Sequence, residues 1–228
     1  MCHQSVLEVC CGSLQSAVNA VAGGAERIEL CSALEVDGLT PPMEVLRELR
    51  LRFPQLKIHV LIRPREGDFV YTEAEIVQME REIHEAVAAG ATAIVCGALT
   101  ADGEIDVPAT KRLVEATEGL PFTFHRAFDV MKDQQMALEA LKALGVHRVL
   151  TSGGAVTAEA GIPTLRQFIH QAHGEIIILP GGGVNSRNAR RILTETGATE
   201  IHGSCSKVLA DGSRQTSTTE VAAVLGVI

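Results

Sequence analysis

Residues 24–31, GAERIELC, contain the pattern that decides the fold. The pattern is Gly-[Ala/Val]-x-x-[Val/Ile], and it recurs at Gly90 (GATAI), Gly145 (GVHRV) and Gly197 (GATEI), at intervals of 66, 55 and 52 residues. Glycine in this position is typical of a helix end, where the chain takes a left-handed conformation before it turns into the next strand. We therefore expect a helix before each of these glycines and a β-strand after it.

Short β-rich runs alternate with amphipathic helical stretches along the rest of the chain. Each interval between two copies of the pattern has room for two strand–helix units, and strands three and five are entered through Pro54 and Pro121 instead. Eight such units predict a parallel sheet that closes into a (β/α)8 TIM barrel, a single domain over residues 1–228. The predicted strands are Val6–Cys10, Arg27–Cys31, Lys57–Arg63, Ala93–Gly97, Phe122–Arg126, Arg148–Ser152, Glu175–Pro180 and Glu200–Ser204.

An open, doubly wound sheet is the alternative fold for the same alternation of strands and helices. That fold would place a glycine-rich turn directly after the first strand, where it would hold a dinucleotide. The sequence there is CCGSLQS, which supplies only Gly12. The barrel is therefore favoured, and no nucleotide cofactor is expected.

Composition and charge restrict the class of function. A chain of 228 residues is long enough to bury a core that needs no disulfide or structural metal. The net charge of −8, the absence of Trp and the single Tyr argue against a nucleic-acid partner. No apolar run approaches the length of a membrane span, and the start MCHQSVLEV has no basic stretch followed by an apolar one. We expect a cytoplasmic protein without a membrane partner, in which the six cysteines are thiols.

The C-terminal ends of the predicted strands carry chemically reactive side chains. In a TIM barrel these ends meet at one mouth, where the functional groups lie. A purely structural barrel would end its strands in aliphatic or small residues. The ends in this chain are Glu8-x-Cys10, Glu29-x-Cys31, Arg63, Cys96-Gly97, His125-Arg126, Thr151-Ser152, Pro180-Gly181-Gly182-Gly183 and Gly203-Ser204.

The first two strands share the motif Glu-x-Cys. Residues two apart lie on the same face of a strand, so Glu8 faces with Cys10 and Glu29 faces with Cys31. The alternative places each glutamate beneath the helices as half of an ion pair, and burial of a glutamate there is rare without such a partner. We therefore expect both carboxylates inside the barrel, with both thiols on the same face about 6–7 Å further along the strands.

Three interpretations of the Cys10–Cys31 pair remain open from the residues alone. Adjacent parallel strands lie about 4.8 Å apart, so the two thiols could share one soft cation, and paired thiolates favour Cu(I). The same spacing also allows a disulfide. Buried cytosolic cysteines are, moreover, often small core residues without a ligand.

Two inward carboxylates need cations nearby, or their pKa values would rise. By strand order the nearest candidates are Arg63 and His125. Arg63 either neutralises Glu29 and keeps the barrel end folded or contacts a ligand. His125, in the run TFHRAFD beside Arg126 and Asp129, is expected to belong to the site.

The end of the seventh strand, ILPGGGVNSRN, predicts an anion-binding loop. It offers Gly181, Gly182 and Gly183, followed by Asn185 or Ser186 as the N-cap of the next helix. In TIM barrels the loops after strands seven and eight commonly hold such a site, so Gly203 and Ser204 would complete it. Glycines also occur in tight turns that bind nothing, which is the competing interpretation.

The chain resembles the CutC family, the copper homeostasis proteins. The resemblance is carried in order by LEVCCGSLQSAVNAVAGGAERIELCSALEVDGLTP, IRPREGDFVYT, GALTADGEID, FHRAFD, RVLTSGG and LPGGGVNSRNARRIL, and it spans nearly the whole chain. It implies a cytoplasmic (β/α)8 barrel that forms a homodimer or higher homo-oligomer. It also implies a role in copper homeostasis, with Cu(I) bound by the thiols of the two Glu-x-Cys strands, here Cys10 and Cys31.

An enzyme acting on a small anionic metabolite, such as a phosphorylated one, is the alternative function. Its catalytic candidates are Glu8 and Glu29 for acid–base chemistry and Arg63 and His125 for orienting charge. No lysine lies at the end of a predicted strand, and Lys57 lies at the start of one. This argues against Schiff-base chemistry at the mouth. A scaffold recognised through its outer helices is a third hypothesis, which only the expected oligomerisation supports.

Overall fold

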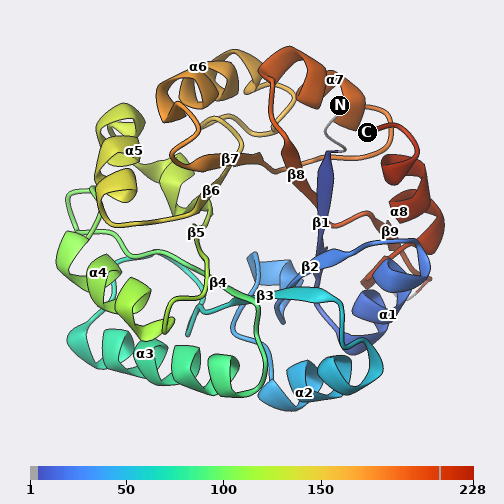
Figure 1. Cartoon of the computed structure of the whole chain (residues 1–228), viewed down its shortest axis with the longest axis horizontal. Helices are drawn as coiled ribbons and strands as arrows, with labels where there is room; N and C mark the ends of the chain where they lie inside the picture. The colour runs from blue at the N-terminus through green and yellow to red at the C-terminus, as the bar shows by residue number, and fades with distance from the viewer. Residues whose placement is uncertain (1–4, 211) are drawn as a thin grey trace.

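The computed structural model describes residues 5–210 and 212–228 and contains an eight-stranded parallel β-sheet surrounded by helices (Figure 1). Neighbouring strands follow the order β7-β6-β5-β4-β3-β2-β1-β8, and Figure 1 shows the sheet curled into a ring in which β7 lies beside β8. The predicted (β/α)8 barrel is therefore confirmed, and the doubly wound alternative is wrong. The strands are β1 (Val6–Cys11), β2 (Arg27–Leu30), β3 (Lys57–Leu61), β4 (Ala93–Cys96), β5 (Phe122–Phe124), β6 (Arg148–Thr151), β7 (Ile177–Pro180) and β8 (Glu200–Gly203).

The helices form the outer layer of the ring (Figure 1). None of those in the described residues is long and apolar enough to cross a membrane, and α3 is the longest, with 16 residues. Two short 3-10 helices, η1 (Leu34–Val36) and η2 (Arg126–Val130), follow β2 and β5. The α-helices are α1 (Leu14–Ala22), α2 (Met43–Arg52), α3 (Glu73–Ala88), α4 (Val107–Ala116), α5 (Gln134–Ala143), α6 (Ile162–Ala172), α7 (Ala189–Thr196) and α8 (Thr218–Leu225).

The four glycines of the repeated pattern have the predicted conformation. Gly24, Gly90, Gly145 and Gly197 have φ angles of 97°, 96°, 75° and 81°, in the left-handed region that side chains with a Cβ disfavour. Each lies between the end of a helix and the start of β2, β4, β6 or β8. The repeat thus marks the same turn four times around the barrel.

The register of β1 against β2 places the two Glu-x-Cys motifs out of step. Glu8 lies opposite Arg27, and Cys10 lies opposite Glu29. The motif on β2 is therefore displaced by two residues towards the mouth relative to the motif on β1. This displacement is the stagger that strands need in order to close a barrel.

The two faces of the sheet differ in polarity. Ile28, Leu30, Ile58 and Val60 alternate with polar residues along β2 and β3 and belong to the large apolar core that includes the helices. The residues between them point to the other face, into the barrel. That interior holds the half-buried side chain of Arg148 and the buried charged and imidazole side chains of Glu8, Arg27, Glu29, His59, Glu200 and His202.

A hairpin between β8 and α8 is absent from the sequence-based prediction. Its strands are β9 (Ser206–Val208) and β10 (Arg214–Thr216), which pair antiparallel with Lys207 opposite Gln215. The runs SKV and RQT are only three residues long and contain one apolar residue, Val208, so they lack the apolar alternation that marks a strand. The hairpin begins two residues after β8 and so lies at the mouth.

Candidate functional site

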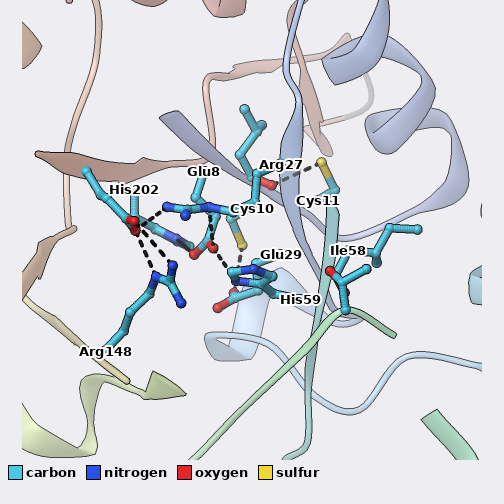
Figure 2. Close-up of polar contacts among 12 residues, drawn as sticks. Glu8, Cys10, Cys11, Arg27, Glu29, Ile58, His59, Arg148 and His202 are labelled. Carbon is cyan, nitrogen blue, oxygen red and sulfur yellow. Dashed lines mark hydrogen bonds and ion pairs between the residues drawn. The ribbon is translucent and has the colours of Figure 1, made fainter. Parts of the chain in front are cut away.

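Glu8 lies at the centre of the barrel interior and is completely buried (Figure 2). Its Oε2 is 2.6 Å from Nδ1 of His59 and 3.1 Å from Nε of Arg27, and its Oε1 is 3.0 Å from Nδ1 of His202. Burial alone would raise the pKa of Glu8, but the charges of His59 and Arg27 and the hydrogen bonds from both imidazoles hold it well below its usual range. Glu8 is therefore an ionised anchor for three strands, β2, β3 and β8.

A second buried carboxylate continues this network towards the opposite side of the barrel. Arg27 donates from Nη2 to Oε2 of Glu200 at 2.6 Å, and Arg148 donates to both oxygens of Glu200 at 2.8 and 3.2 Å (Figure 2). Burial acts to raise the pKa of Glu200, and the hydrogen bonds and charges of Arg148 and Arg27 lower it overall. Arg27 thus bridges Glu8 and Glu200, and an ionic network replaces the aliphatic layers that usually fill a TIM barrel.

Glu29 is placed differently from Glu8, although the two belong to the same motif. Within the described residues it forms no ion pair, and its Oε1 accepts a hydrogen bond from the Cys10 thiol at 3.4 Å. Burial raises the pKa of Glu29, an effect that the charge of His202 opposes and the charge of Glu8 reinforces. Glu29 is therefore a buried carboxyl group with a raised proton affinity beside a thiol.

Cys10 and Cys31 lie next to each other, as the sequence predicts, with their Sγ atoms 3.7 Å apart. Cys31 also lies 3.6 Å from the carbonyl oxygen of Cys11. The hydrogen bond with Cys31 and burial both raise the pKa of the Cys10 thiol well above its usual value. The two sulfurs and one oxygen of Glu29 all lie within 4.8 Å of one another, which is close enough for one metal ion.

The remaining described cysteines, Cys11, Cys96 and Cys205, belong to a different buried cluster from this pair. Cys11 and Cys96 belong to the apolar core between sheet and helices, whereas Cys10 and Cys31 form a separate cluster with Leu61 and Val95 inside the barrel. All the cysteines in residues 5–210 and 212–228 are free thiols, so the disulfide interpretation of the pair is wrong for this structure. Cys2 lies outside the described residues.

A cavity of about 1030 Å³ opens above these side chains at the mouth of the barrel. Cys10, Glu29 and His202 line it from the strands, so the thiol and carboxyl groups are reached from the mouth. The glycine loop after β7 and the β9–β10 hairpin line the same cavity. The thiol pair and the predicted anion loop therefore share one cavity.

Arg63 reaches the mouth but does not neutralise Glu29. Its guanidinium donates to the carbonyl oxygens of Val36 at 2.7 Å, Gly38 at 3.0 Å and Gly67 at 2.9 Å. It therefore fastens the loops after β2 and β3 to each other. The basic side chains close to the buried carboxylates are Arg27, Arg148, His59 and His202, which the sequence analysis did not select.

His125 is buried in the wall of the cavity, 4.8 Å from the ring of Phe69. Its Nδ1 accepts a hydrogen bond from the backbone N–H of Ala127, and its Nε2 has no partner among the described residues. Burial, aided by the charge of Arg63, lowers the pKa of His125 to about 3. The imidazole is therefore neutral near pH 7 and carries its proton on the free Nε2.

The glycine loop takes an unusual backbone path. Gly182 and Gly183 have φ angles of 104° and 72° and line the cavity, whereas the N–H of Gly181 donates to the carbonyl oxygen of Thr151 and is already used. Gly203 and Ser204 also line the cavity, and Oγ of Ser204 lies 3.0 Å from that of Ser206.

The helix after this loop starts later than predicted. Its N-cap is Asn188, not Asn185 or Ser186, and α7 begins at Ala189. Asn185 instead forms a local turn, because its side chain accepts a hydrogen bond from the N–H of Arg187 and donates to the carbonyl oxygen of Gly183. The free donors of the loop therefore come from its glycines and not from the helix end.

Comparisons with known proteins agree on the family. A sequence model of the CutC family matches residues 5–207. The copper homeostasis protein cutC homolog of Homo sapiens is 47% identical over 209 residues, which are 92% of this chain and 76% of the human protein. A family protein CutC of Bacteroides thetaiotaomicron is also 47% identical, over 86% of this chain and 78% of its own.

The same agreement holds for a solved structure. The crystal structure of a copper homeostasis protein CutC from Streptococcus agalactiae is 35% identical, with a TM-score of 0.84. The match covers 88% of this chain and 98% of the streptococcal one.

Proposed function

Because the chain belongs to the CutC family, we propose that it acts in copper homeostasis by binding Cu(I) through Cys10 and Cys31. The observation that carries this proposal is the 3.7 Å separation of the two Sγ atoms on adjacent strands. Thiolates are the soft ligands that Cu(I) prefers, and two of them suffice for a low-coordinate site. The ion is cargo here, taken up and released through the cavity at the mouth.

The surroundings of the pair suit an exchangeable site. Cys10 and Cys31 are buried, but Cys10 also lines the cavity, so an ion arriving from the mouth meets its sulfur directly. The buried ionic network below the two thiols supports them. Glu8 lies two residues before Cys10 on β1 and is held by partners on three other strands. Little rearrangement of β1 and β2 is then needed when the ion binds.

Glu29 provides a route for the protons that binding displaces. A thiol must lose its proton to ligate Cu(I), so each sulfur that binds releases one proton. The Cys10 thiol already donates to Oε1 of Glu29 at 3.4 Å, and Glu29 lines the cavity. The carboxylate therefore takes the proton from Sγ and passes it to solvent at the mouth.

The proposal places the protein in the cytoplasm, as a homodimer or higher homo-oligomer. A reducing compartment keeps cysteines as thiols, which is the form that the two Cu(I) donors require. Light scattering after size-exclusion chromatography measures the mass of the assembly. A monomer at micromolar concentration would contradict the oligomeric part without affecting the metal site.

The metal site is tested by anaerobic competition for Cu(I) with a chromophoric chelator. The unmodified chain is expected to hold one equivalent, and a Cys10→Ser, Cys31→Ser variant is expected to lose it. The matched control is Cys11→Ser, Cys96→Ser, which removes two thiols from the apolar core and leaves the pair in place. Unchanged stoichiometry in the first variant would contradict the proposal.

A further inference from the structure

We propose that the mouth cavity also binds the phosphate group of a small phosphorylated molecule, on the glycine loop after β7 and the cations around it. The organic part of such a ligand would extend into the rest of the cavity, towards Glu29 and Cys10. This inference goes beyond copper binding and does not depend on it, because it rests on different residues.

The backbone donors of the glycine loop are the first observation. In the described part of the chain the N–H groups of Gly182 and Gly183 have no acceptor, and both residues line the cavity. Successive backbone N–H groups in a turn can form a concave nest that favours anions. The loop thus presents two donors that no described residue satisfies.

The neighbouring loop after β6 has a similar set of backbone donors, but a side chain of the protein accepts their hydrogen bonds. The carboxylate of Asp129 accepts hydrogen bonds from the N–H groups of Ser152 at 3.1 Å and Gly154 at 3.2 Å, and from the hydroxyl of Thr151. Asp129 is in turn paired with Arg126 at 2.8 Å. The β6 loop therefore holds an internal anion, whereas the β7 loop next to it does not.

Unpaired positive charge beside the β7 loop is the second observation. Arg187, Lys207 and Arg214 line the cavity, and none of them forms an ion pair within the described residues. Arg214 instead donates to Oγ of Ser206 at 3.0 and 3.1 Å. Three free cations around one cavity are notable in a chain of net charge −8, and they suit a dianion better than a single carboxylate.

The acidic side chains of the outer cavity do not neutralise these cations. Asp129 is bound by Arg126 and the β6 loop, and Oε1 of Glu220 accepts the N–H of Ser186 at 2.7 Å. Glu220 keeps its negative charge, and Asp37, which also lines the cavity, forms no ion pair within the described residues. Arg187, Lys207 and Arg214 outnumber these two carboxylates, so the charge beside the glycine loop remains positive.

A buried donor in the cavity wall is the third observation. The side chain of His125 is only 5% exposed, yet its Nε2 has no partner among the described residues. An unsatisfied buried donor costs free energy, so its presence in a cavity wall indicates an acceptor supplied by a ligand. A hydroxyl or phosphate oxygen of a phosphorylated molecule is such an acceptor.

The size of the cavity favours a phosphate ester over free phosphate. Its volume of about 1030 Å³ matches the upper range of pockets for small organic ligands and far exceeds one phosphate ion. Glu29 and His202 line the part of the cavity nearest the strands, where the organic portion would lie. A carboxyl group and an imidazole at that point offer acid–base chemistry to the ligand.

Isothermal titration calorimetry with inorganic phosphate, glycerol 3-phosphate and glycerol tests the inference on the full chain. We expect both phosphates to bind, the ester more tightly, and glycerol not to bind. An Arg187→Ala, Arg214→Ala variant should weaken phosphate binding at least tenfold. The matched control is Arg81→Ala, Lys111→Ala, which removes the same charge from exposed positions on α3 and α4 and should keep the original affinity.

Three results would overturn the inference: no heat from either phosphate at about 10 mM, equal weakening in the variant and the control, or no gain for the ester over inorganic phosphate. If Arg187→Ala, Arg214→Ala loses its native melting transition, Lys207→Gln alone serves the same comparison. The copper proposal fails independently, because Cys10→Ser, Cys31→Ser should still bind phosphate and Arg187→Ala, Arg214→Ala should still bind Cu(I).

Discussion

The carboxylate of Glu8 on β1 lies 3.1 Å from Nε of Arg27, the residue directly opposite it on β2. The pair sits inside the barrel, and neither side chain is more than 4% exposed. Since a shift of one residue between the strands would move one partner to the helix side, the pair fixes the register. The same register places Cys10 opposite Glu29 and so brings together the residues of the proposed metal site.

Replacement of Glu8 by glutamine should destabilise the fold strongly. The substitution keeps the size of the side chain but removes the carboxylate that lies beside Arg27, His59 and His202. Arg27 then has Glu200 as its remaining counter-charge. The loss of one partner from a buried pair costs about 3–5 kcal/mol. Denaturant unfolding followed by circular dichroism measures the change in the free energy of unfolding. Glu85→Gln, on the exposed face of α3, is the control and should stay within about 0.5 kcal/mol. Equal stability of the two variants would show that the buried network contributes nothing.

Lowering the pH should remove the contribution of Glu8 to the free energy of unfolding. The pKa of Glu8 is lower in the folded protein than its ordinary value of 4.5, so the stabilisation is complete above that value. It is lost as the pH falls below 4.5 and through the lower folded pKa. Unfolding curves of the unmodified chain and of Glu8→Gln should therefore converge as the pH decreases from 5 to 3. Curves that stay parallel over this range would contradict the pKa direction.

When the pH is lowered, His125 should begin to reduce the stability of the fold at a higher pH than Glu8 does. Its pKa is about 3 in the folded protein and 6.5 ordinarily, so between these values the unfolded chain binds a proton that the folded one does not. Stability should consequently rise with pH up to about 6.5, by about 1.4 kcal/mol per pH unit from this group. His125→Phe should show a shallower slope between pH 4 and 6. Val95→Ala, a buried variant without a titratable group, should lose stability but keep the slope.

Cu(I) affinity should increase with pH. The pKa of Cys10 lies well above its usual value, so the thiol is protonated near neutral pH and releases its proton when it binds the ion. The apparent affinity should rise about tenfold per pH unit for each proton released, as measured by chelator competition between pH 6 and 8. In Cys10→Ser the remaining affinity should depend less steeply on pH. A pH-independent affinity in the unmodified chain would exclude these thiols as ligands.

The barrel and its mouth were predictable because local signals specify them. The four glycines mark helix ends through a backbone conformation that other residues disfavour, and apolar alternation marks the strands. The closeness of Cys10 and Cys31 also followed, since both precede turns at the same end of neighbouring strands. The register did not follow, because the sequence does not encode stagger locally. Glu8 and Glu29 therefore appeared equivalent when they are not.

The partners of the buried carboxylates were missed for a related reason. Strand order alone pointed to Arg63 and His125, but Arg63 turns to three carbonyl groups and His125 is held neutral. The sequence does contain the missing signal. Arg27 begins β2, and His59 and His202 lie inside β3 and β8; each is next to an aliphatic residue of its strand, and this alternation places the polar side chain on the inner face. Reading every position of each strand, and not only its C-terminal end, would have found them.

The stagger between β1 and β2 gives the two copies of Glu-x-Cys different tasks. Farther from the mouth, the carboxylate of Glu8 is surrounded by Arg27 and two histidines and holds β1 to three other strands. At the shallower level the same residue type faces the cavity with its proton affinity raised and a thiol within reach. The same tripeptide motif thus contributes one glutamate to the buried ionic network and another to the lining of the cavity. The distance of each glutamate from the mouth of the barrel therefore determines its role. Two strands with the same motif can serve different purposes when they are staggered.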